Sequence, residues 1–286
     1  MYTSAINPKQ IISRQRASSF IQSHMVLPED TRVIATEAFT RKNKIHTLEL
    51  PDSLYSINPR AFKTCCFLRE VQLPHGLKEL GNGAFSECAR LKKVYISKSL
   101  KIIHKDTFRE DRCLERVLFT PDSQLKQIQA DAFNECSSLQ FILLPSGVTS
   151  ISDRAFYRCK SLKHVRFPEG LTSIGKEAFY FCGMDTLDLP DSLEVLEDSA
   201  FFKCTFLTEV RLPSHIRHIG KWVFHGCSRL KVLEIRHDPE SIGDWIINRA
   251  STIRCYKGSA ADDYCKRSGF TTEYIEEDSA STPSLR

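Results

Sequence analysis

The chain has 286 residues, 41% hydrophobic and 26% charged, which is ordinary for a folded protein and excludes wholesale disorder. Its 40 Lys and Arg against 35 Asp and Glu leave a net charge of +5, spread too evenly along the chain to predict nucleic-acid binding. No stretch approaches the about 18 consecutive apolar residues of a membrane helix, so we expect no membrane insertion.

Residues 1–24 precede the periodic part of the chain. They carry Arg14 and Arg16 with no apolar stretch behind them, which is not the pattern of a secretory signal peptide. Two interpretations stay open for this segment, a cap on the first repeat or an unstructured lead.

From Met25 onward the chain repeats, with steps of 23, 23, 23, 23, 25, 23, 22, 23 and 23 residues between successive units. The units begin at Met25, Leu48, Val71, Val94, Val117, Ile142, Val165, Leu187, Val210 and Leu233. One aligned column contains half of the 18 Phe residues, namely Phe39, Phe62, Phe85, Phe108, Phe133, Phe156, Phe179, Phe201 and Phe224. Because a unit this short cannot bury its own apolar face, stacked units must share a continuous core.

Each unit predicts two pieces of local structure. The alternation in Val71-Gln-Leu73 and its copies indicates a short strand, ended in most units by a proline. The stretch Ala-Phe-x-x-Cys-x-x-Leu has spacings of three and four, which predict a short helix on the other face. The expected fold is therefore an α/β solenoid over residues 25–253, with about ten coils and a short parallel sheet on one face.

Four units depart from the pattern, the tenth because it loses the repeat after Ile242. The fourth has Ser97 in place of proline and Asp111 in place of cysteine. The fifth is two residues longer after Phe119, where we expect a bulge at the strand end, and the seventh is one residue shorter around Gly183-Met184.

The array is followed by a segment of different character. Residues 254–275 contain a helix that Ser259 would cap and Gly269 would stop, so we expect a C-terminal cap there. Residues 276–286 are polar, and we expect them to be disordered.

The repeat resembles a known family. Leu68-x-x-Val71-x-Leu73 and its copies match the core of a leucine-rich repeat. The fuller pattern Leu-Pro-x-x-Leu-x-x-Ile-Gly-x-x-Ala-Phe-x-x-Cys-x-x-Leu resembles the BspA-type leucine-rich repeat over about residues 25–253. The resemblance implies a right-handed superhelix, a strand-and-helix cap, and roles in adhesion or host interaction at the cell surface or outside the cell.

The cysteines form a second column: Cys65, Cys88, Cys136, Cys159, Cys182, Cys204 and Cys227. Ladder side chains run parallel and do not converge, so we favour buried thiols over a metal site or disulfides. Cys255 and Cys265 leave open a disulfide across the cap if the protein is exported.

No catalytic or nucleotide-binding motif is found, so we predict neither an enzyme nor a cofactor. His215, His218 and His225 lie close in sequence to Cys227, but we interpret them as exposed turn residues and predict no metal site.

The surface that remains is the outward side of the strands. Its middle combines apolar residues with basic ones, the composition of a protein-binding hot spot, although single exposed apolar residues are normal. We name the predicted ligand-binding set the strand-face patch; it comprises Lys93, Tyr95, Arg116, Leu118, Phe141, Leu143, His164, Arg166 and Arg211.

The predicted function is non-catalytic binding of a protein, or alternatively a glycan, by a monomeric array. An intracellular scaffold or effector, and a targeting partner of a separate enzyme, are the alternatives. The sequence as given favours the cytoplasm, whereas the resemblance favours the cell surface or secretion.

Overall fold

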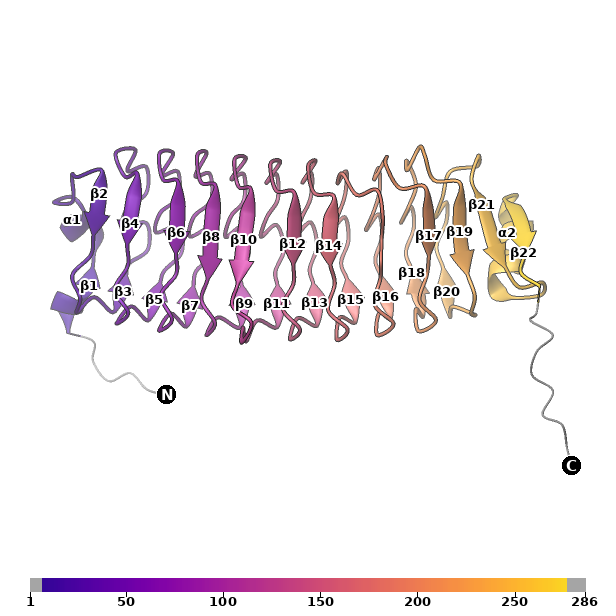
Figure 1. The fold of residues 1–286 in the computed structure, drawn as a ribbon, viewed down its shortest axis with the longest axis horizontal. Helices are drawn as coiled ribbons and strands as arrows, with labels where there is room; N and C mark the ends of the chain where they lie inside the picture. The colour runs from indigo at the N-terminus through magenta and orange to yellow at the C-terminus, as the bar shows by residue number, and fades with distance from the viewer. Residues whose placement is uncertain (1–6, 277–286) are drawn as a thin grey trace, which may run out of the picture.

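The computed structural model describes residues 7–276 and has the shape of a rod of stacked coils, with the two ends of the chain at opposite ends of the rod (Figure 1). Two rows of parallel strands run along it. The solenoid predicted from the repeat is thus confirmed.

The first row contains the Val-x-Leu segments predicted to be strands. Its members are β2 (His24–Val26), β4 (Thr47–Glu49), β6 (Glu70–Gln72), β8 (Lys93–Ile96), β10 (Arg116–Phe119), β12 (Phe141–Leu143), β14 (His164–Arg166), β17 (Glu209–Arg211), β19 (Val232–Ile235), β21 (Thr252–Cys255) and β22 (Thr271–Tyr274). Equivalent residues of neighbouring coils lie side by side, as with Phe141 and His164. Each column of the sequence therefore becomes a line of side chains along the rod.

The hydrogen-bonded ladder of this first row is interrupted at three places, between β4 and β6, between β10 and β12 and between β14 and β17, and the last two coincide with a change in repeat length. β10 and β12 lie on either side of the two-residue insertion. No strand forms at residues 186–188, directly after the unit that is one residue short. The strand expected around Leu187 is therefore absent from the described structure.

The second row was not predicted. It consists of two-residue strands built around the Ile/Leu column: β1 (Ile11–Ile12), β3 (Val33–Ile34), β5 (Ser56–Ile57), β7 (Glu79–Leu80), β9 (Ile102–Ile103), β11 (Gln127–Ile128), β13 (Ser150–Ile151), β15 (Ser173–Ile174), β16 (Val195–Leu196), β18 (His218–Ile219) and β20 (Ser241–Ile242). The described rod thus has about 11 coils instead of ten.

The extra coil comes from the segment before the first repeat. Strand β1 pairs in parallel with β3, after the short 3-10 helix η1 (Pro8–Gln10) and before helix α1 (Arg14–Ala17). The Phe20 ring packs edge-on against Phe39 at 5.8 Å. Residues 7–24 therefore cover the first Phe of the core.

The helices expected in every coil are the main error of the sequence analysis. The Ala-Phe-x-x-Cys stretch forms consecutive turns, with two positive-φ residues in nearly every coil, such as Arg60 at 55° and Thr64 at 58°. Between them the Phe62 N–H donates to the Ala84 carbonyl of the next coil at 2.8 Å. These amides bond between coils and not within a helix, so the label α/β fits this solenoid only loosely.

The core of the rod is a ladder of the nine Phe side chains, all fully buried. Neighbouring rings stack nearly parallel, with centroids 5.0 to 6.0 Å apart. Beside them, each column cysteine donates its thiol to the carbonyl of the Phe of an earlier coil, as Cys159 does to Phe133 at 3.2 Å. The widest ring spacing, between Phe85 and Phe108, falls where Asp111 replaces cysteine.

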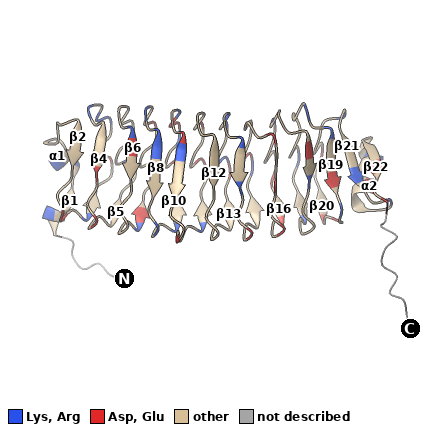
Figure 2. Ribbon diagram, viewed as in Figure 1, with Lys and Arg blue, Asp and Glu red and all other residues tan. Residues whose placement is uncertain are grey.

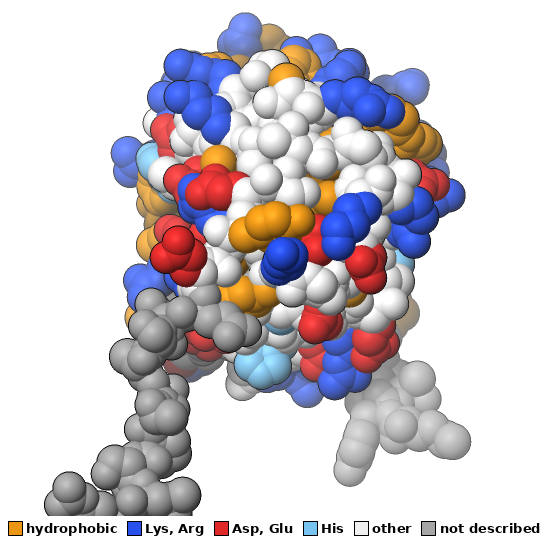
Figure 3. Space-filling view, turned by 90° about the vertical axis from the view of Figure 1, so that its right-hand side faces the viewer, with side chains coloured by type: hydrophobic (Ala, Val, Ile, Leu, Met, Phe, Trp, Pro, Cys, Tyr) orange, Lys and Arg blue, Asp and Glu red, His pale blue; other side chains and the backbone are white. Residues whose placement is uncertain are grey.

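The far end is closed by β21, helix α2 (Ala260–Ser268) and β22. The Ser259 hydroxyl accepts from the Asp262 N–H at 3.2 Å, and Gly269 ends the helix with a φ of 71°, as predicted. Charged side chains surround this end, where apolar ones form only small separate patches (Figure 3).

The predicted disordered tail lies outside the described residues, except for Glu276. Among residues 7–276, no helix is long and apolar enough to cross a membrane.

Candidate ligand-binding face

The structure brings together eight of the nine residues of the strand-face patch, on the strands β8, β10, β12 and β14. Lys93 lies beside Arg116 and Tyr95 beside Leu118. Phe141 lies beside His164 and Leu143 beside Arg166 in the same way.

The apolar members differ in exposure. Leu143 is 56% exposed. Tyr95, Leu118 and Phe141 were expected to be exposed but are half-buried. The open apolar surface is therefore centred on Leu143.

The basic members of β10 and β14 carry unneutralised charge. Within the described residues, Arg116, His164 and Arg166 have no ion pair, and Lys93 reaches Glu70 only at 4.0 Å. Figure 2 shows basic residues on β8 and β10, in contrast to an acidic residue on β19. This part of the face can attract an anionic partner.

Arg211, the ninth residue of the strand-face patch, lies apart from the other eight. It lies on β17, beyond the coil without a strand, and its Nε is 3.4 Å from the Glu234 carboxylate. Glu234 is only 5% exposed, because Arg236 at 2.6 Å and Arg254 at 3.1 Å also cover it. Burial raises the pKa of Glu234, but hydrogen bonds from Arg236 and Arg254 outweigh this effect and hold it below its usual value.

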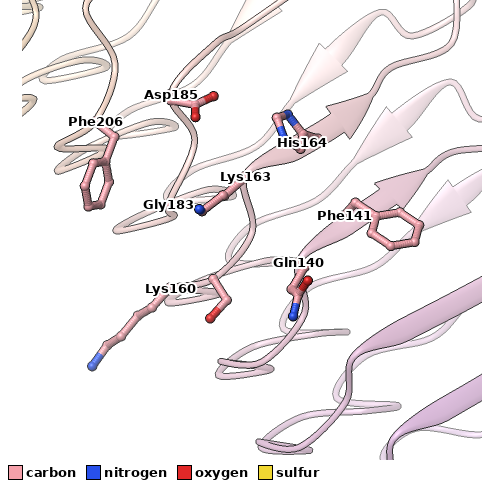
Figure 4. A pocket seen from close by; sticks show the side chains of 9 residues that line it. Gln140, Phe141, Lys160, Lys163, His164, Gly183, Asp185 and Phe206 are labelled. Atoms are coloured by element: carbon pink, nitrogen blue, oxygen red, sulfur yellow. The ribbon is translucent and has the colours of Figure 1, made fainter.

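A hollow of about 570 Å³ lies where β12 and β14 begin (Figure 4). Phe141 and His164 of the patch line it, together with Lys163, Asp185 and Phe206, which the sequence analysis did not select. The one-residue deletion at Gly183-Met184 was the available signal, but its effect on the surface appears only in three dimensions.

The repeat itself has a known counterpart. A family model described as "BspA type Leucine rich repeat region (6 copies)" matches residues 16–140 and 126–254. The chain belongs to the BspA-type leucine-rich repeat family. Members typically bind proteins or act in adhesion.

Solved structures with the same architecture include a leucine-rich repeat protein from Bacteroides ovatus, with 25% identity and a TM-score of 0.67 over 84% of this chain and 64% of that one. The BspA-type chain thus spans less than two thirds of that protein's length. Pneumococcal vaccine antigen PcpA is 21% identical (TM-score 0.47, 90% and 79% coverage), and a leucine-rich cell surface protein from Faecalibacterium prausnitzii is 21% identical (TM-score 0.44, 89% and 60% coverage). Among curated proteins, none matches this chain.

The side chains capable of covalent or metal chemistry are dispersed or sequestered. All eleven cysteines are free thiols, including Cys255 and Cys265, so the disulfide considered across the cap is not formed. Burial raises the pKa of the Cys65 thiol to about 12, and the thiolate is the reactive form.

Within residues 7–276, no three His, Cys, Asp or Glu side chains are grouped as a metal site requires. Of the histidines predicted to be exposed turn residues, His218 is half-buried in β18 and bonds Ser241 at 2.6 Å, and the half-buried His225 contacts the Ile247 carbonyl at 3.3 Å.

Proposed function

We propose that this BspA-type chain is a non-catalytic binding module that holds a protein ligand across β8, β10, β12 and β14, in an adhesion or host-interaction role. The observation that carries the proposal is the exposed Leu143 with Arg116, His164 and Arg166 around it, none of them paired within the described residues. An apolar centre with basic neighbours suits a protein surface that offers an apolar side chain and carboxylates.

The test begins with an immobilised array exposed to host-cell surface proteins, from which a retained protein is identified and purified. Its affinity is then measured in solution for the wild type and for Leu143→Asp. A charge placed at the centre of the interface should weaken binding at least about tenfold, which corresponds to about 1.4 kcal/mol.

The array provides a matched control. Val26 occupies the same position of its coil as Leu143 and is similarly exposed, at 49%, but lies on β2, outside the patch. Val26→Asp should leave the affinity unchanged, and both variants should unfold at the wild-type temperature.

Equal affinity for the wild type and Leu143→Asp would contradict the proposal. Retention of a glycan or of a cytoplasmic enzyme in place of a host-surface protein would favour one of the alternative functions.

A further inference from the structure

The hollow beside β12 and β14 results from one missing residue. In the coils on either side, two residues separate the column cysteine from the next buried apolar residue, such as Lys160 and Ser161 after Cys159. In the short unit only Gly183 stands between Cys182 and the buried Met184. A Cβ at Gly183 would collide with the Lys160 carbonyl oxygen, so this turn is drawn tightly against its neighbour.

Phe206 lies at the edge of the hollow (Figure 4). Phe67 occupies the same position of its own coil and serves as an internal comparison. The Phe67 ring is covered by Arg90 at 4.3 Å and by His46 at 5.4 Å. Phe206 is 50% exposed, and no ring or cation contact to it is found within residues 7–276. Its ring face is therefore open to a ligand.

The charge of the lining favours an anion. Lys163 and His164 are exposed and have no ion pair within the described part of the chain, and Lys160 lies at the rim. Asp185 is the single carboxylate among the lining residues. The exposed Phe206 ring, with basic side chains nearby, suits an apolar side chain next to a carboxylate.

We propose that this hollow is a subsite for an acidic peptide segment. An apolar side chain of the ligand packs on the open ring of Phe206, and a neighbouring carboxylate meets Lys163 and His164. The inference rests on the proposed function, since the same ligand would continue from the hollow onto β12 and β14.

The decisive variant fills the gap. A serine inserted between Gly183 and Met184 restores the two-residue spacing of the other coils and should fold at least as stably as the wild type. The probe is a fluorescein-labelled pentapeptide, Asp-Glu-Phe-Glu-Asp, with Asn-Gln-Phe-Gln-Asn as its uncharged counterpart, and binding is followed by fluorescence anisotropy.

We expect the wild type to bind the acidic peptide at least about tenfold more tightly than the uncharged one. The insertion should abolish this binding, and Phe206→Ser should weaken it about tenfold. Phe67→Ser, the matched change outside the hollow, should have no effect.

Failure of the wild type to bind the peptide, equal binding by the insertion variant, or preference for an acidic oligosaccharide would each overturn the subsite. The protein ligand identified by capture separates this failure from that of the general function. If it binds the insertion variant normally but not Leu143→Asp, the subsite is wrong and the strand-face function stands.

Discussion

Two stretches of the same strand face use arginine in opposite ways. On β10 and β14, Arg116 and Arg166 have no ion pair within the described residues. On β17 and β21, Arg211 and Arg254 both contact Glu234, and Arg254 also pairs with Glu209 and Glu273 at 3.2 and 3.0 Å. The paired arginines fasten the last coils to the cap, whereas the unpaired ones contribute little to folding and remain available to a ligand.

The largest effect should follow from breaking the paired end. Glu234→Gln removes the carboxylate on which three arginines converge, and we expect a loss of about 3 kcal/mol, because this nearly buried carboxylate accepts charge-assisted hydrogen bonds from Arg236 and Arg254. Urea unfolding followed by tryptophan fluorescence measures it directly, since both Trp residues, Trp222 and Trp245, lie in the last coils.

Glu209→Gln is the control for this prediction, because that carboxylate is 61% exposed and should contribute at most about 0.5 kcal/mol. Equal losses in the two variants would show that the buried network does not hold the cap.

A substitution in the core, at Asp111, should have the next largest effect on the free energy of unfolding, and it should increase stability. Asp111 is fully buried in the cysteine column; its Oδ1 accepts from the Cys88 N–H at 2.7 Å, but its Oδ2 has no hydrogen-bond partner. Asp111→Cys restores the column, and we expect a gain of about 2 kcal/mol at pH 7.5 in urea unfolding.

The gain should depend on pH. Burial raises the pKa of Asp111 well above its ordinary value of 3.8, so the folded chain holds this proton to a higher pH than the unfolded chain does. The native aspartate therefore costs most stability at high pH and least below about 3.8, where both states are protonated. A gain that stays constant from pH 4 to pH 8 would contradict this account.

The third prediction concerns the stability of the C-terminal coils at low pH. Because the pKa of Glu234 is lowered from 4.5, its contribution is complete above that pH and is lost as the pH falls through the folded-state pKa. Tryptophan fluorescence should thus show the C-terminal coils losing stability below about pH 4.5, by less than the substitution costs. In Glu234→Gln this part of the acid sensitivity should disappear.

The smallest expected change in stability tests most directly whether the paired and unpaired arginines differ. Arg166→Gln should change the free energy of unfolding by less than about 0.5 kcal/mol, because no partner is lost. Arg211→Gln should cost about 0.5 kcal/mol at low salt, and that cost should vanish at high salt, as expected for an exposed pair. If Arg166→Gln destabilises the chain more than Arg211→Gln, the two stretches do not differ as described.

The sequence predicts those parts of this fold that follow directly from the repeat period. The Phe and Cys columns are correctly placed in the core, because stacking identical units converts a sequence period into a line of buried side chains. The short helices are wrong, since the spacing of Ala, Phe and Cys is also met by turns in which residues such as Arg60 and Thr64 adopt positive φ.

The candidate site was predictable only in part. The alternation of the strands identifies Leu143, Arg116 and Arg166 as outward-facing. The pairing of Arg211 with Glu234 depends on which long side chains reach across coils, and the exposure of Phe206 depends on how a shortened turn retracts. The repeat period determines neither the reach of these side chains nor the position of the shortened turn.

The cysteine column makes the local opening of individual coils measurable by thiol labelling. Each of the seven thiols of this column is buried and hydrogen-bonded to an earlier coil, so a modifying reagent reaches it only when that coil separates from its neighbours. The rates at which individual thiols become labelled would therefore show, coil by coil, how often each part of the solenoid opens locally.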